Sequence, residues 1–150
     1  LMLGDADSWA SQVRDLAIKG GETGRQFGHV WEDFTTRGFA DTGWQIVGRN
    51  IRIVVNGNPV TEVDLLLLRD DLLLVVEIKA LAGVGMNPYD HWKNRETIER
   101  GCRQAKLAAA RLDDNRTLLV SVTSRRIAER VKVIQPLVLT NESLFNGWEH

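Results

Sequence analysis

The sequence of 150 residues contains one cysteine, three prolines and no long apolar run. Cys102 has no partner for an internal disulfide, and a single cysteine excludes a zinc site built from paired cysteines. The longest apolar runs, residues 65–68 and 72–76, fall far short of the ~20 residues that span a bilayer. No basic-then-apolar leader opens the chain, so we expect no secretion signal. These absences predict a reducing, cytoplasmic location.

An excess of charge of one sign is also lacking, because 19 basic side chains face 20 acidic ones. This balance excludes a polybasic or an acidic disordered tail, but it permits a local basic face. The hydrophobic fraction of 43% is enough for one buried core, and the length suits one domain. We therefore expect a single domain over 1–150, with a core at 23–140 and a helical extension at 1–22. We also expect it to be part of a longer chain with further domains.

The spacing of apolar residues predicts an α/β fold. In chain order it gives helices at 5–19 and 23–37, strands at 44–55, 60–68 and 72–80, a long helix at 91–112 and a final strand at 131–140. Residues 116–130 suit either a helix or a strand, and we favour a helix. The order ααβββα(α)β predicts a central mixed sheet, an antiparallel meander plus a C-terminal strand, flanked by helices.

Glycine and proline indicate where these elements end or bend. Gly38 suits the C-cap of the second helix, and Gly48 suits a bend in the first strand. Pro136 predicts that the final strand lies at an edge of the sheet or is irregular. We assign Trp92 to the buried side of the long helix.

Charged residues stand at two points beside the leucine-rich strands. Glu62-Val63-Asp64 is followed by twelve apolar or turn residues and then by Glu77-Ile78-Lys79. Side chains alternate along a strand, so a hairpin between these strands can place Asp64 and Glu77 on one face. Two facing carboxylates repel, and a divalent cation such as Mg²⁺ removes that conflict. The Ile78 carbonyl is a further candidate ligand, and Lys79 is placed to bind a water or a phosphate.

These residues resemble the D-x(n)-(D/E)-x-K signature of the PD-(D/E)xK, or restriction-endonuclease-like, nucleases. The resemblance covers about residues 24–112 and looks closest to Holliday-junction resolvases and the nuclease-related domain. It implies a restriction-endonuclease-like core and metal-dependent hydrolysis of DNA, with Mg²⁺ as cofactor and Mn²⁺ as substitute. It further implies that Asp64 and Glu77 are metal ligands and that Lys79 is the catalytic lysine.

Two more site residues follow from the resemblance. Members often carry a glutamate on the first core helix. The matching window here contains no acid, so Glu32 and Glu22 are the neighbouring candidates, and we prefer Glu32 as a metal ligand because it lies within the predicted helix. Several branches place a glutamine on the helix that follows the lysine strand. Gln104 is the candidate here, and it would hold a phosphate or a water.

Basic residues outnumber acidic ones between His91 and Lys132, which favours a polyanionic partner. The residues that we expect to bind nucleic acid are Lys93, Trp92, Arg100 and Arg103. DNA is preferred over RNA as the partner, and a homodimer is compatible with a small site that cuts one strand.

Other interpretations remain open on the sequence alone. The charged triplets can form a cross-strand salt-bridge cluster. Glu62 suits the surface better than a ligand position, and His29 suits a helix surface better than a ligand position. The domain can also be an inactive nuclease-fold module that binds nucleic acid or protein, or a toxin-like or tRNA-processing enzyme that cuts RNA.

Overall fold

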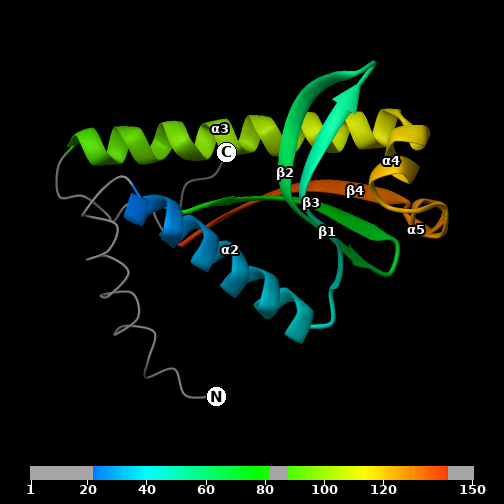
Figure 1. Cartoon of the computed structure of the whole chain (residues 1–150), viewed down its shortest axis with the longest axis horizontal. Helices are drawn as coiled ribbons and strands as arrows, with labels where there is room; N and C mark the ends of the chain where they lie inside the picture. The colour runs from blue at the N-terminus through cyan, green and yellow to red at the C-terminus, as the bar shows by residue number, and fades with distance from the viewer. Residues whose placement is uncertain (1–21, 82–87, 142–150) are drawn as a thin grey trace.

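The computed structural model describes residues 22–81 and 88–141, which form one sheet with helices on both faces (Figure 1). The elements are α2 (Glu22–Asp41), β1 (Gln45–Val55), β2 (Asn58–Arg69), β3 (Leu72–Lys79), α3 (Pro88–Asp114), α4 (Arg116–Val122), α5 (Arg125–Arg130) and β4 (Val133–Thr140). The predicted α/β fold is confirmed for this part of the chain. The helix predicted at 5–19 lies outside the described residues.

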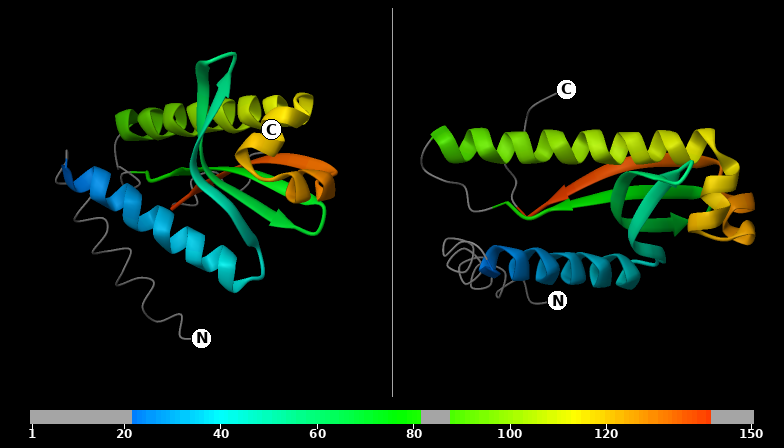
Figure 2. Two further views of the ribbon diagram at one scale, coloured as in Figure 1. Left: turned by 45° about the vertical axis from the view of Figure 1, so that its right-hand side comes forward. Right: turned by 45° about the horizontal axis from the view of Figure 1, so that its top comes forward.

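The sheet has the strand order β1-β2-β3-β4. Strands β1, β2 and β3 form the predicted antiparallel meander, and β4 adds in parallel to β3. Figure 2 shows α3 along one face of the sheet and α2 along the other. Strand β4 is an edge strand, as Pro136 predicts, because an edge leaves one side of the strand without a ladder partner.

The strands β2 and β3 form the centre of the core because they are apolar on both faces. One buried cluster, with Leu66, Leu73 and Val75, packs against α3, α4 and α5. The other, with Leu65 and Val76, packs against side chains of α2 and β1. Because side chains alternate along a strand, the same two strands contribute side chains to both buried clusters, one on each face of the sheet.

Left-handed residues close the two hairpins. Asn56 and Gly57 have φ of 53° and 80°, the signature of a two-residue turn whose twist matches the strands. Asp70 has φ of 54° in the second turn. The bend predicted at Gly48 is confirmed, because the β1–β2 register shifts between Ile46 and Gly48. That shift changes which face the following β1 residues occupy.

Two local predictions are wrong. Gly38 does not cap α2, because the helix continues to Asp41 and buries Phe39 edge-on against Trp44. Gly43, with φ of 85°, takes the left-handed position instead. Trp92 is 58% exposed, because the buried face of α3 follows Gly101 and the small residues after it. Within the described residues, no helix is both long and apolar enough to cross a membrane.

The segment 116–130 forms two short helices, as we favoured. Asn115 caps α4 by accepting a hydrogen bond from the Leu118 N–H, and Ser124 caps α5 by accepting one from the Ile127 N–H. Each cap satisfies a backbone donor that the first helical turn leaves without a partner. Two good caps within ten residues explain why this segment is helical despite its β-branched residues.

Candidate functional site

The candidate site lies where β2 and β3 part. Their pairing runs from Arg69↔Leu72 to Leu65↔Val76 and stops there. Asp64 is the next residue on β2, and its Oδ2 accepts a hydrogen bond from the Ile78 N–H at 2.6 Å. The carboxylate thus takes the place of a strand partner. Because the N–H and C=O of one strand residue point toward the same neighbour, the Ile78 carbonyl is directed to this gap as well.

Asp64, Glu77 and Lys79 come together at this point. Lys79 Nζ donates a hydrogen bond to Glu77 Oε2 at 2.5 Å and lies 3.9 Å from Asp64 Oδ2. Glu77 and Lys79 are two residues apart on one strand and therefore share a face. The sequence prediction that these three side chains meet is thus confirmed as geometry.

Burial dominates the electrostatics of Glu77. The residue is 1% exposed, and its Oε1 is buried without a hydrogen-bond partner. Desolvation raises the pKa of the Glu77 carboxyl to about 7, although the hydrogen bond from Lys79 opposes this. The negative charge of Asp64 contributes to the same rise. Glu77 is therefore a carboxyl that a second positive charge would stabilise in its ionised form.

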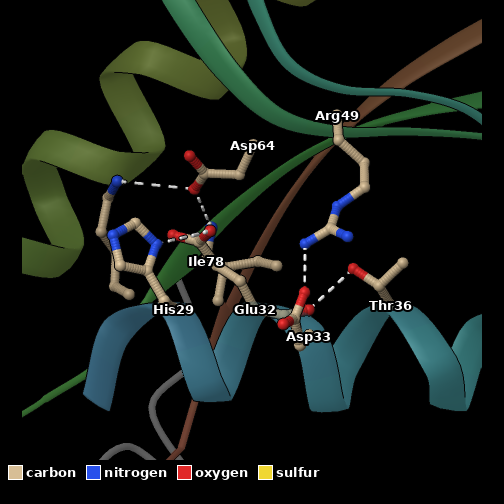
Figure 3. A network of polar contacts seen from close by, with 8 residues as sticks. His29, Glu32, Asp33, Thr36, Arg49, Asp64 and Ile78 are labelled. Atoms are coloured by element: carbon tan, nitrogen blue, oxygen red, sulfur yellow. Dashed lines mark hydrogen bonds and ion pairs between the residues drawn. The ribbon is translucent and has the colours of Figure 1, made fainter. Parts of the chain in front are cut away.

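Helix α2 supplies a third carboxyl on the other side of Asp64. Figure 3 shows Glu32 beside Asp64, with His29 one turn earlier on the same helix. Burial raises the pKa of Glu32, and the charge of Asp64 raises it further. His29 Nδ1 lies 3.8 Å from Glu32 Oε2. Of the two predicted helix acids, Glu32 faces the site, whereas the side chain of Glu22 lies outside the described part of the structure.

Helix α3 closes the site from the opposite face of the sheet. Gly101 is buried, and a Cβ atom there would stand 3.1 Å from Lys79 Cε and 3.2 Å from Lys79 Cγ. A glycine at this position lets the helix backbone lie directly on the lysine stem. Gln104 is half-buried one helical turn later on the same side of α3.

The residues predicted to bind nucleic acid lie on the surface of α3. Lys93, Arg100 and Arg103 are exposed there, and so is Trp92. Glu62 is exposed on β2, as expected of a surface acid. The role of the basic side chains of α3 in binding nucleic acid stays a prediction.

Sequence reasoning missed an ion pair beside the site. Arg49 of β1 binds Asp33 of α2, so that it ties the helix to the sheet (Figure 3). No pattern in the sequence could have revealed this pair, since the β1 bulge decides which face Arg49 occupies. Gly101 left a clearer signal, because a glycine inside a long helix often indicates a close backbone approach.

No family model matches this chain, and no curated protein is similar to it. The resemblance to PD-(D/E)xK nucleases therefore stays a prediction, and the geometry of the site carries the functional argument.

The donor set has the chemistry that a hard divalent cation requires. Glu77 Oε1 is a buried oxygen without a partner, and its neighbour Asp64 repels it. Oxygen ligands of this kind suit Mg²⁺, which keeps several waters and needs few protein ligands. Across residues 22–81 and 88–141, however, no three acidic, histidine or cysteine side chains converge as a complete ligand set. Two oxygens of the cluster are engaged by Lys79 Nζ and by the Ile78 N–H.

Proposed function

We propose that this domain is a Mg²⁺-dependent nuclease that hydrolyses phosphodiester bonds of DNA. The observation that carries the proposal is the buried, incompletely satisfied Glu77 carboxyl beside Asp64, with the Lys79 ammonium within 2.5 and 3.9 Å of their oxygens. Two carboxylates and one amine at the parting of two strands form a compact site for a cation and a phosphate. This arrangement is also the one that the PD-(D/E)xK resemblance implies.

In this proposal each residue of the site has a separate role. Asp64 and Glu77 would hold the ion, with the Ile78 carbonyl and Glu32 as further ligands. A bound Mg²⁺ or Mn²⁺ would supply charge neutralisation at the phosphate and a lower pKa for water. Lys79 then positions the attacking water and stabilises negative charge that develops on a phosphate oxygen. Gln104, one turn from Gly101, is placed to hold the backbone or a water.

The direct test is cleavage of linear duplex, branched and single-stranded DNA with Mg²⁺ and with chelator. We expect cleavage that chelator abolishes. Asp64→Asn should abolish it, and Lys79→Ala should lower it about 10²–10³-fold, the usual loss for one group that stabilises developing charge. Asp70→Asn is the matched control, because this acid is exposed in the turn at the other end of the same hairpin. Absence of cleavage on every substrate, with Lys79→Ala like wild type, contradicts the proposal.

A nuclease-fold module without catalysis is the second candidate. The incomplete ligand set in the described residues favours it, because Lys79 and Ile78 already engage the carboxylates. Nucleic-acid binding that neither chelator nor Asp64→Asn changes would select this candidate. Adding single-stranded RNA to the substrate panel separates an RNA-cleaving enzyme from a DNA-cleaving one.

A further inference from the structure

Helix α3 is a wall of the candidate site. Its backbone at Gly101 leaves no room for a Cβ, which would meet Lys79 Cε at 3.1 Å and Val138 Cγ1 at 3.4 Å. Arg100 and Arg103 flank Gly101 in sequence, and both are exposed. The helical period turns Arg103 to the side of α3 away from Gly101, whereas Arg100 lies one turn before Gln104 on the same side of the helix. The helix itself therefore stands between Arg103 and the carboxyl cluster. A phosphodiester backbone bound along the outer face of α3 would be separated from the acids by the width of that helix.

The side of the cluster that faces α2 is polar and reaches solvent at its rim. The side chains of Asp64 and Glu32 are 19% and 21% exposed, whereas that of His29 beside them is 70% exposed. Arg49 and Asp33 are 42% and 52% exposed. Figure 3 shows these residues together, with Asp64 on β2, Arg49 on β1 and the others along α2. The most exposed charged groups next to the acids thus belong to α2 and β1.

Arg49 is the cation of this side. It pairs with Leu65 in the β1–β2 ladder and so stands beside the strand residue next to Asp64. Asn50, which follows it, has a left-handed backbone with φ of 50° and fixes the course of β1 there. Asp33 holds the guanidinium through one terminal nitrogen, Nη2. A guanidinium has five N–H donors in a planar fork, so this ion pair leaves donors in the geometry that binds phosphate oxygens.

We infer that the nucleic-acid backbone enters the site across the surface formed by α2 and β1, where Arg49 binds a phosphate next to the one that is cleaved. This rests on the proposed function, and it names the contacting surface and residue. Asp33 is a positioning residue that holds Arg49 in place.

The test compares two arginines on the two sides of the site. Binding of a fluorescent DNA oligonucleotide is measured by anisotropy in Ca²⁺ over a range of salt concentrations, with Arg49→Gln and the matched variant Arg103→Gln. We expect Arg49→Gln to weaken binding about tenfold, the loss of one charge-assisted contact, and to reduce the salt slope by about 1. Arg103→Gln should change the Kd less than twofold. Arg49→Lys keeps the charge and should retain the salt slope with a smaller loss of affinity.

Asp33→Asn tests the positioning role, because it keeps Arg49 but releases it, and we expect a loss of affinity of a few-fold. All four variants alter exposed side chains, so thermal unfolding should confirm that they fold like wild type. Unchanged affinity and salt slope in Arg49→Gln, with wild type still cleaving DNA, overturns this inference and leaves the proposed function intact. A loss confined to Arg103→Gln overturns it in favour of α3. A wild-type protein that neither binds nor cleaves any nucleic acid overturns both proposals.

Discussion

The hairpin of β2 and β3 contains two regions of opposite character. From Leu65↔Val76 to Arg69↔Leu72 the strands are fully paired, and seven of the twelve residues from Leu65 to Val76 are buried leucines or valines. Asp64 and Glu77 stand one residue beyond the open end of that pairing, and both carry carboxyl groups. Glu77 is as buried as its leucine neighbours at 1% exposure, yet its Oε1 has no partner. The apolar region supplies the rigidity that holds a charged group in an environment it does not favour.

The two regions also differ in what they contribute: the apolar region stabilises the fold, whereas the charged region carries the groups proposed for the chemistry. Each fully buried leucine contributes roughly 1.5–3 kcal/mol by leaving water. A buried carboxyl without a complete set of partners costs stability instead. Proteins accept such costs where a ligand or a reaction needs the group. The four predictions below test whether this division between the two regions holds.

Leu66→Ala should have the largest effect on stability. Leu66 is 0% exposed within the cluster that packs on α3 and α4, so the truncation leaves a cavity. We expect a loss of about 2–5 kcal/mol in the free energy of unfolding, measured by urea denaturation. Val54→Ala is the control, because Val54 is 43% exposed in β1 and should change stability by less than about 0.5 kcal/mol. Equal effects of the two variants would contradict the assignment of the core.

Divalent cations should stabilise the folded protein by binding at Asp64 and Glu77. At a Mn²⁺ concentration 100 times its Kd we expect about 2.7 kcal/mol of added stability, seen as a rise in Tm. Asp64→Ala and Glu77→Ala should each remove this rise, because each deletes an oxygen donor. Asp70→Ala, in the turn of the same hairpin, should keep it. A rise that survives in both site variants places the cation elsewhere.

Much of this contrast could be predicted from the sequence. The leucine runs and the turn residues fix the register of the hairpin, and the register decides that Asp64 and Glu77 lie beside the end of the pairing. The approach of Lys79 follows from its separation of two residues from Glu77. These are local consequences of strand alternation, which is why pattern reasoning found them.

Glu77→Gln should remove the pH dependence of stability that the burial of Glu77 imposes. The pKa of Glu77 is raised from 4.5 to about 7 in the folded protein, so the folded state binds the proton more tightly than the unfolded state. The contribution of this group to stability is therefore present below pH 4.5 and is lost as the pH rises toward 7. At pH 8 without divalent cations, Glu77→Gln should be more stable than wild type by on the order of 1–3 kcal/mol. The difference should vanish near pH 4, and a difference that does not vary with pH contradicts the raised pKa.

Gly101→Ala should have the smallest effect, and its sign depends on Lys79. Alanine favours a helix interior over glycine by about 1 kcal/mol, but the new Cβ would crowd Lys79 Cε and Cγ. We expect close to the full gain in the Lys79→Ala background and a smaller gain, or a loss, in wild type. The double-mutant cycle is measured by urea denaturation. An identical effect in the two backgrounds shows that α3 does not press on the lysine.

The elements that the sequence could not reveal are set by tertiary contacts. The end of α2 depends on Phe39 packing against Trp44 from the next element. The pairing of Arg49 with Asp33 depends on a bulge in β1 and on where α2 crosses the sheet. None of these is encoded within one stretch of residues.

The position of β4 near the end of the described chain affects the order in which the site folds during synthesis. Glu77 and Lys79 have their ladder partners at Val138 and Thr140, not on β2. As the ribosome makes the chain, the acids and the lysine emerge well before the strand that aligns them, and parallel pairing across such a separation forms slowly. A nascent or truncated chain that ends before β4 would carry all the reactive side chains without the frame that aligns them.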